Sequence, residues 1–194
     1  MTKLKETPSQ TAGPYLHIGC MPNAAGIPGV YATDPGAEMV SPATIGERVS
    51  IEGVIIDGVG APVTDALVEI WQADAAGRYP GNDPMADPAF AGWGRAASDP
   101  QTGLWQITTI RPGPVPWTEG GRQAPHLSLW IAARGLNVGL QTRMYFPGVE
   151  MGSDPVLALA GTRAETLIAT ELGAGRLRFD IHLQGARETV FFDV

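Results

Sequence analysis

The residues best placed to do chemistry lie where a Pro/Gly-rich loop, carrying Trp117, runs into a predicted strand that begins near His126. Alternate side chains of a strand share a face, so His126 and Ser128 should point to the same side. A histidine that opens a strand, with a short polar residue two positions on, suggests a metal site. It equally suggests a site that has lost its metal, or an ordinary hydrogen-bonded histidine at a strand end. We expect His17 and His182 to be ordinary polar side chains.

The elements that must position these residues are strands. Hydrophobic alternation predicts that Leu127, Leu129 and Ile131 face a core, on the side opposite to His126. Similar short runs recur along the chain, separated by Gly, Pro and Asp turn signals. The predicted strands cover 47–57, 66–74, 92–99, 104–110, 126–133, 141–146, 178–185 and 189–194, with short helices at 155–160 and 164–170.

This pattern predicts an all-β fold, a two-sheet β-sandwich of about eight strands with an extended N-terminal arm and minor short helices. We expect a single domain over residues 1–194, with 1–46 as the arm and irregular lead-in and 47–194 as the sandwich. A long arm with little periodicity is unusual in a compact domain unless it packs on something or does something.

Composition narrows the classes of function. The chain has 194 residues, 44% of them hydrophobic, so it can bury a core. Its formal net charge of −7 argues against a nucleic-acid partner, because such affinity comes mainly from Lys and Arg on phosphates. The longest uncharged stretch, 16–33, is broken by prolines and glycines, so we expect no membrane span. Cys20 is the only cysteine and residues 1–10 hold no apolar signal segment, which predicts a cytoplasmic protein.

Three motifs resemble the intradiol ring-cleaving dioxygenases: GRY at 77–79, RPGPVPW at 111–117 and APHLSLW at 124–130. Further stretches extend the resemblance over nearly the whole chain, and more closely to the iron-free subunit of a two-subunit member: TPSQTAGPYLHIG at 7–19, EIWQAD at 69–74, ARGLNVGLQTRMYF at 133–146, RFDIHLQG at 178–185 and TVFFDV at 189–194. The family's catalytic chains hold a non-haem Fe(III) with two tyrosines and two histidines, the histidines spaced as H-x-H on one strand face. Phenolate oxygens stabilise the hard ferric ion, and imidazoles complete the set.

Carried onto this sequence, the family's site is incomplete. Tyr79 matches the first tyrosine and His126 the first histidine, whereas the second tyrosine is Val115 and the second histidine is Ser128. The arginine that the family carries three residues before the first histidine is Gln123 here. Because two strong ligands cannot hold a ferric ion against water, the resemblance implies that this chain binds no metal, has no catalytic residues and is inactive alone. The two matching residues would then be relics that pack and hydrogen-bond.

The resemblance also implies a partner. It predicts a homologous catalytic beta subunit of the same fold, which holds the Fe(III), in a higher-order (αβ)n hetero-oligomer whose active site lies at the subunit interface. The implied substrates are 3,4-dihydroxybenzoate and O2. The implied product is 3-carboxy-cis,cis-muconate, an entry to the β-ketoadipate pathway of aromatic catabolism.

The substrate carries a carboxylate, which a guanidinium can hold bidentately. The residues implied to reach the substrate are Arg134 and, from the arm, Thr11, Gly13, Pro14 and Tyr15. If its strand stays regular, Arg134 lies about 26 Å beyond His126 at about 3.3 Å per residue. It cannot serve the pocket beside that histidine, so a ligand of Arg134 must lie elsewhere.

Simpler interpretations stay open. Arg134 can form a structural ion pair at the subunit interface, and the arm can be a tether that only buries surface. The whole chain can be a stand-alone ligand-binding β-sandwich derived from the same fold. Val115 disfavours an iron enzyme with substituted ligands, and the single cysteine and the arm disfavour an adhesion-type sandwich.

Overall fold

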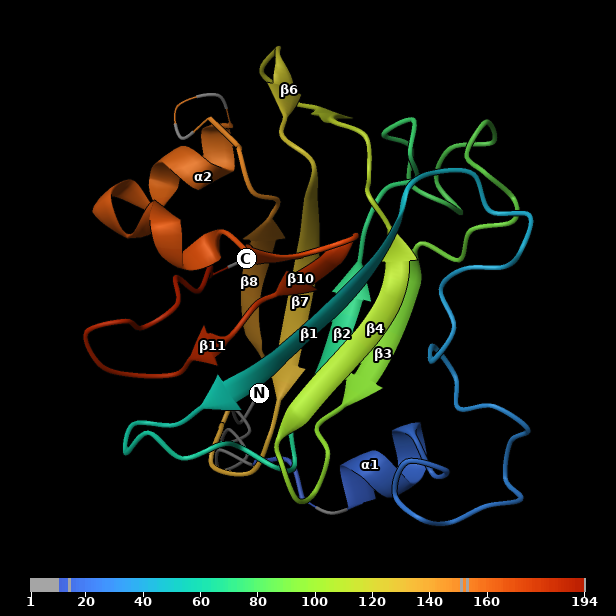
Figure 1. Ribbon diagram of the computed structural model, residues 1–194, viewed down its shortest axis with the longest axis vertical. Coiled ribbons are helices and arrows are strands. Elements are labelled where there is room, and N and C mark those ends of the chain that lie inside the picture. Colours follow the sequence, from blue (N-terminus) through green and yellow to red (C-terminus); the bar gives the residue numbers. More distant parts are fainter. Residues whose placement is uncertain (1–10, 14, 151, 153, 194) are drawn as a thin grey trace, which may run out of the picture.

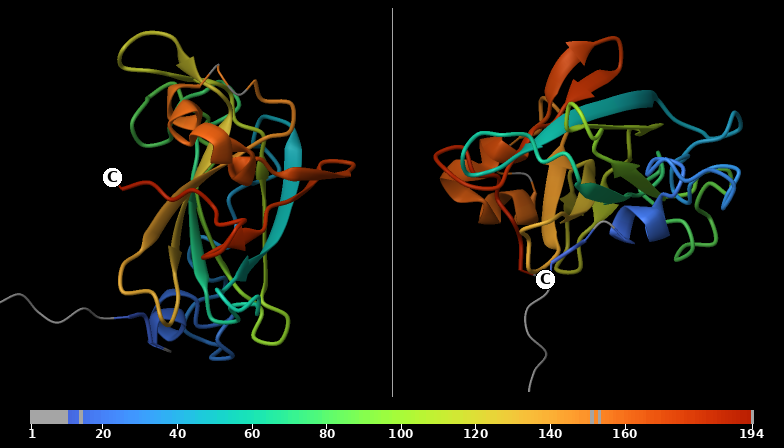
Figure 2. Two further views of the ribbon diagram at one scale, coloured as in Figure 1. Left: turned by 90° about the vertical axis from the view of Figure 1, so that its left-hand side faces the viewer. Right: turned by 90° about the horizontal axis from the view of Figure 1, so that it is seen from below.

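Two sheets packed face to face form the body of the molecule (Figures 1 and 2). The structure, a computed structural model, describes residues 11–13, 15–150, 152 and 154–193. The first sheet holds β1 (Arg48–Ile56), β4 (Leu104–Ile110), β9 (Thr170–Gly173), β10 (Arg176–Arg178) and β11 (Ile181–His182), and the second holds β2 (Leu67–Trp71), β3 (Trp93–Ala97), β7 (His126–Ala132) and β8 (Leu140–Tyr145); β5 (Val115–Pro116) and β6 (Arg122–Gln123) form a separate hairpin. The predicted all-β sandwich is confirmed, with eleven strands in the described residues, three of them only two residues long.

The second sheet has the order β3-β2-β7-β8, and all its pairs are antiparallel. Leu127, Leu129 and Ile131 of β7 are at most 2% exposed, which confirms the predicted core face. They pack in one cluster with inward residues of the first sheet such as Ile51 and Ile55. Burial of each such side chain contributes about 1.5–3 kcal/mol to the stability of the fold.

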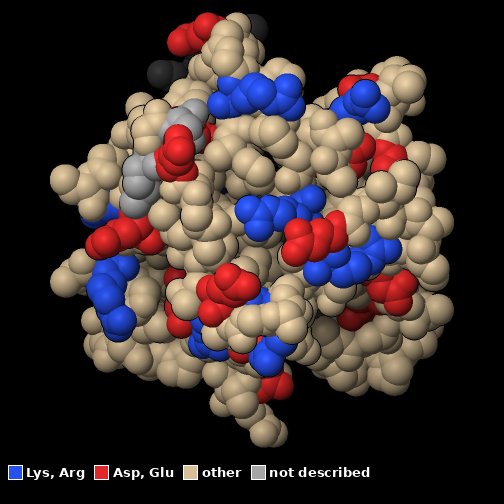
Figure 3. All heavy atoms as spheres, turned by 45° about the horizontal axis from the view of Figure 1, so that its top comes forward, with Lys and Arg blue, Asp and Glu red and all other residues tan. Residues whose placement is uncertain are grey.

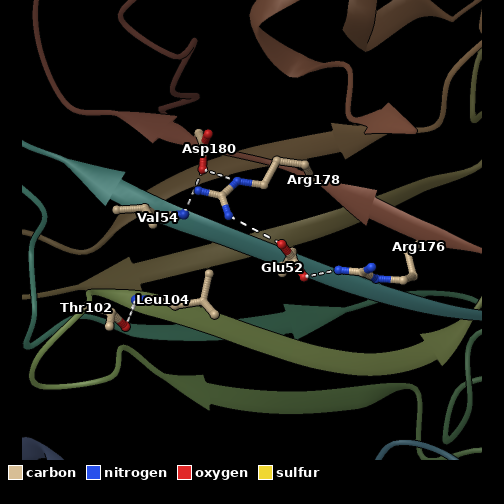
Figure 4. Close-up of polar contacts among 7 residues, drawn as sticks. All are labelled: Glu52, Val54, Thr102, Leu104, Arg176, Arg178 and Asp180. Carbon is tan, nitrogen blue, oxygen red and sulfur yellow. Dashed lines mark hydrogen bonds and ion pairs between the residues drawn. The ribbon is translucent and has the colours of Figure 1, made fainter. Parts of the chain in front are cut away.

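Strand β1 organises the first sheet, because β10 and β11 pair with it in parallel and β4 in antiparallel. Salt bridges reinforce the parallel pairing of β1 with β10. The Glu52 carboxylate forms ion pairs with Arg176 at 3.1 Å and with Arg178 at 3.4 Å (Figure 4). Asp180 bonds Arg178 at 2.8 Å and accepts the backbone N–H of Val54 at 2.8 Å. These charges remain partly accessible to solvent and add little energy individually, so their main effect is to favour one register.

Gly53 lies where β1 passes from β10 to β11. A Cβ added to Gly53 would lie 1.9 Å from the carbonyl oxygen of Phe179, so a side chain cannot fit there. The predicted strand at 178–185 is divided: Arg178 ends β10, Ile181 and His182 form β11, and 183–185 are not in a strand. Phe179 and Ile181 are buried and belong to the main core cluster.

The helices are short and lie at the edges. α1 (Tyr15–Cys20) lies at the bottom of Figure 1, whereas α2 (Pro155–Leu159) and a 3-10 helix (Gly161–Leu167) lie beside β8. Leu157 and Leu167 pack with Tyr145 in a second apolar cluster. None of the helices in the described part of the chain has the length and hydropathy needed to cross a bilayer.

Other segments also differ from the sequence prediction. The predicted helix at 164–170 is the end of the 3-10 helix, which stops at Leu167, and Thr170 begins β9. The arm contains α1, which was missed because this six-residue helix has no buried side chain and therefore no apolar stripe. The predicted last strand, 189–194, is irregular in its described part and joins the second sheet by one bridge, between Gln141 and Phe192. Thr189 and Val190 are buried and Phe191 and Phe192 are half-buried, so the segment packs on the sandwich without a ladder of paired residues.

Candidate functional site

The sequence motifs at 77–79, 111–117 and 124–130 meet at the end of the molecule where β7 begins, at the top of Figure 1. Tyr79 stacks on Trp71 of β2, with ring centroids 5.9 Å apart, and Trp71 lies opposite Ser128 of β7. A Cβ on Gly77 would lie 2.2 Å from the carbonyl oxygen of Pro114, so the loop that carries Tyr79 is pressed against the residue before Val115. The four positions of the family's ligand pattern therefore belong to one region.

The His126 side chain is buried, and one hydrogen bond determines its tautomer. Its side chain is 3% exposed, and its Nδ1–H donates to the carbonyl of Ala124 at 2.8 Å. That bond leaves the lone pair on Nε2, a buried atom without a hydrogen-bond partner among the described residues. Burial first, then the positive charge of Arg143, lowers the pKa of His126 to about 4, against the opposing effects of Ala124 and Asp154. The ring is therefore neutral at pH 7.

Arg143 lies at the centre of this region, and the sequence analysis did not single it out. Its Nη1 donates to Oε1 of Gln123 at 2.7 Å and to the hydroxyl of Tyr145 at 3.3 Å. The Tyr145 hydroxyl donates in turn to Asp154 at 3.0 Å. Burial raises the pKa of Tyr145 and of Tyr79, and the Arg143 charge opposes both shifts. Alternation in β8 places Gln141, Arg143 and Tyr145 on one face of the sheet. The pairing of β8 with β7 makes this the face that also carries His126 and Ser128.

Asp154 anchors the network. Its Oδ1 accepts the N–H groups of Val156 and Leu157, each at 2.8 Å, and thereby caps α2. Its Oδ2 accepts the N–H of Ala124 at 2.7 Å, just before the strand that carries the histidine. These bonds occupy both oxygens of a fully buried carboxylate. We therefore assign Asp154 a structural role, which is to join α2 to the start of β7.

These side chains do not fit a ferric ion. His126 presents a free Nε2, which suits a metal, and Tyr79 supplies one phenol. Val115 has no donor atom and the Ser128 hydroxyl is a weak neutral donor, so half of the family's ligand set is missing. The described residues also contain no group of three His, Cys, Asp or Glu side chains that could hold a metal.

A cavity of about 470 Å³ opens at the same end, beside the β5–β6 hairpin. Arg111, Arg122, Gln123 and Phe146 are among its lining residues, and neither Tyr79 nor His126 lines it. In Figure 3, where this end comes forward, basic and acidic side chains are interspersed over the visible face. On the described part of that face, the arginines do not form one continuous basic field of the kind that attracts a polyanion.

Of the residues predicted to bind substrate, the four that the structure describes lie at the opposite end. β7 ends at Ala132, and the turn into β8 carries Arg134, at the bottom of Figure 1 near α1. The Thr11 hydroxyl donates to the carbonyl of Ala133 at 3.2 Å and accepts the N–H of Gly135 at 2.8 Å. Two hydrogen bonds therefore fasten the arm to this turn.

Arg134 and Gly13 line one cavity of about 340 Å³, together with Asp65, His17 and Ser98. The Arg134 side chain is 68% exposed, and its Nε donates to the Asp65 carboxylate. This is an ion pair within the chain, whereas the simpler interpretation above placed one at the subunit interface. The Ser98 hydroxyl, which sequence reasoning missed, is buried without a hydrogen-bond partner among the described residues.

The structure thus brings Arg134, Thr11 and Gly13 together and separates them from His126 by the length of β7. Tyr15 begins α1, is 81% exposed and does not line the cavity. Pro14 lies outside the described residues. Substrate binding by these five residues stays a prediction.

Comparison with known proteins gives a consistent result. The family model described as "Dioxygenase" matches residues 30–185. The protocatechuate 3,4-dioxygenase alpha chain of Pseudomonas putida is 42% identical over 197 residues, which cover 98% of this chain and 97% of that one. The beta chain of Burkholderia cepacia protocatechuate 3,4-dioxygenase is 38% identical over 120 residues, 59% of this chain and 48% of that one.

A solved structure supports the fold. The dioxygenase domain of a dioxygenase–carbohydrate-binding protein fusion from Streptomyces sp. SirexAA-E superposes with a TM-score of 0.60 at 26% sequence identity. The superposition covers 78% of this chain and 89% of that domain. The two proteins therefore share their fold over most of this chain.

The neutral, buried His126 generates a prediction about stability and pH. Its pKa is about 4 in the folded chain and about 6.5 when unfolded, so the unfolded chain binds more protons between these values. Its contribution to stability is complete above pH about 6.5 and is lost as the pH falls toward 4, a loss of about 3 kcal/mol. Urea unfolding at pH 7 and pH 4 should show a larger acid loss in wild type than in His126→Gln, which removes this titration. Equal losses in the two proteins would contradict the prediction.

Proposed function

This chain belongs to the intradiol ring-cleaving dioxygenase family, and we propose that it is the non-iron-binding, alpha-type subunit of an αβ oligomer that cleaves 3,4-dihydroxybenzoate. One observation carries the proposal: a chain similar end to end to an alpha chain has Val115 and Ser128 at two of the four ligand positions. The Fe(III) then belongs to a beta-type partner of the same fold. The alpha and beta chains among the relatives support such a pairing.

The reaction joins both atoms of O2 to the ring carbons that carry the two hydroxyl groups and breaks the bond between them, giving 3-carboxy-cis,cis-muconate. Ferric iron, when bound in the partner, supplies the activation of the catechol. In this chain, the Arg134 guanidinium binds the ring carboxylate. Its Nε is engaged by Asp65, and the terminal Nη groups remain for the substrate in the two-point geometry that arginine favours.

The arm completes the substrate edge of this site. Thr11 fastens the arm to the turn beside Arg134, and Gly13, which has no heavy atom within 4 Å of an added Cβ, presents open backbone at the cavity. Pro14 and Tyr15 follow Gly13 in the sequence, and we propose them as further substrate contacts. We place the complex in the cytoplasm, where a chain with one cysteine needs no disulfide.

A second candidate function rests on the same cavity. It is lined by residues of this chain and could hold a small ligand without a partner. A stand-alone binding protein would then have kept the fold and lost the chemistry.

A reconstitution assay tests the proposed function. This chain, a beta-type partner and their mixture are each supplied with ferric iron, 3,4-dihydroxybenzoate and O2, and oxygen uptake and product are measured. We expect no turnover by this chain alone and turnover by the mixture. Turnover by this chain alone would contradict the proposal, and tight substrate binding by the chain alone without complex formation would favour the stand-alone candidate.

Arg134→Ala in the assembled enzyme tests the carboxylate contact. A lost charge-assisted hydrogen bond costs about 1.5–3 kcal/mol, so we expect KM for 3,4-dihydroxybenzoate to rise about tenfold or more. KM for catechol, which lacks the carboxylate, should change little. Arg163→Ala is the matched control, because Arg163 is also exposed and ion-paired, with Glu188. Equal losses on both substrates would instead identify Arg134 as a structural residue.

A further inference from the structure

We propose that the Arg143 guanidinium takes the place of the metal cation in this chain, so that its charge excludes a ferric ion from the region of Tyr79 and His126 even when the missing ligands are restored. The inference rests on the proposed function, in which this chain binds no iron. The loss of two ligands is one cause of that absence, and the charge of Arg143 is a second. In this view, the region of Tyr79 and His126 holds the guanidinium of Arg143 as its cation and has no place for a metal ion.

The strand register places Arg143 at the lost ligand. In the antiparallel β7–β8 pair, Arg143 lies directly opposite Ser128, the position of the second histidine, and Tyr145 lies opposite His126. Directly opposed residues of an antiparallel pair point to the same face, with Cβ atoms about 4.5–5.5 Å apart. The guanidinium therefore extends from the site's own face of the sheet.

Hydrogen bonds hold the guanidinium there. Gln123 accepts from it at 2.7 Å and Tyr145 at 3.3 Å, and Tyr145 is held by the buried Asp154. Gln123 of β6 occupies the position at which the family carries an arginine. In this chain the positive charge that bonds to this position lies instead on Arg143 of β8. A half-buried cation with fixed partners cannot swing into solvent without leaving them unpaired.

The charge of Arg143 acts on both family ligands that this chain retains. It opposes the raised pKa of Tyr79 and lowers the pKa of His126, and the guanidinium donates to Tyr145, which lies opposite His126 in the strand pair. The nearest carboxylate in the network, Asp154, is occupied by backbone N–H groups and by Tyr145. A trivalent cation entering this space would meet a like charge in a partly desolvated setting, where repulsion is strong.

Ferric titration of full-length variants separates the two causes. Val115→Tyr with Ser128→His restores the ligand types, and a triple variant adds Arg143→Gln, which removes the charge and keeps an amide that can bond Gln123. Arg122→Gln on the same double background is the matched control, because Arg122 is a nearby arginine exposed to solvent. Iron per chain and the visible tyrosinate-to-iron band are measured, with circular dichroism to establish folding.

We expect the triple variant to bind Fe(III) at least about tenfold more tightly than the double variant, and the Arg122 control to match the double variant. Equal affinity of the double and triple variants, or no binding by a folded triple variant, would overturn the inference. Iron and colour in the wild-type chain would instead overturn the proposed function, so the two failures are distinguishable.

A smaller change keeps the test decisive if the triple variant does not fold. Ser128→His alone restores the H-x-H pair on one face of β7, and such a pair binds Co²⁺. Ser128→His/Arg143→Gln should bind Co²⁺ at least about tenfold more tightly than Ser128→His. Equal Co²⁺ affinities would overturn the inference by the same criterion.

Discussion

The pairing of β7 with β2 on one side and β8 on the other is the constraint on which the rest of the structure depends. Leu129 lies opposite Ile70 of β2 and Thr142 of β8, so the strand is held in register from both sides. A slip by one residue would turn Leu127 and Leu129 to the outside and His126 into the core. Hydrophobic burial of the inner face therefore determines what the outer face presents.

Because one strand carries both functional regions, the chain could lose chemistry at one end without moving the other. At the start of β7, Gln123, Arg143, Tyr145 and Asp154 hydrogen-bond in one network, which favours a rigid region. Among the described residues, His126 Nε2 stays buried there without a partner. At its end, Arg134 is exposed and the arm is fastened beside it, which suits a surface completed by a second chain. Under the proposed function, the family fold would serve two purposes in an αβ enzyme: one copy would hold the metal and the other would shape the substrate pocket.

The sequence predicted the core face of β7 because alternation is a short-range rule, and the buried Leu127, Leu129 and Ile131 confirm it. The ligand positions at His126 and Ser128 came from the resemblance to the family's motifs. Arg143 was missed because its importance comes from β7–β8 pairing across a turn, which spacing alone does not reveal. The Asp65–Arg134 pair joins residues 69 positions apart and was equally hidden. Helix α1 buries no side chain and lacks an apolar stripe, so the periodicity of the arm did not predict it.

The claim that iron belongs to the partner is tested most directly by an anomalous-difference map of the assembled αβ complex, recorded at the iron absorption edge. The account predicts an iron peak in the partner, on the side where Gly13 and Arg134 of this chain approach it, and none beside His126 and Arg143. An iron peak beside His126 would show that this chain holds the metal with ligands other than those of its family, and would contradict the account.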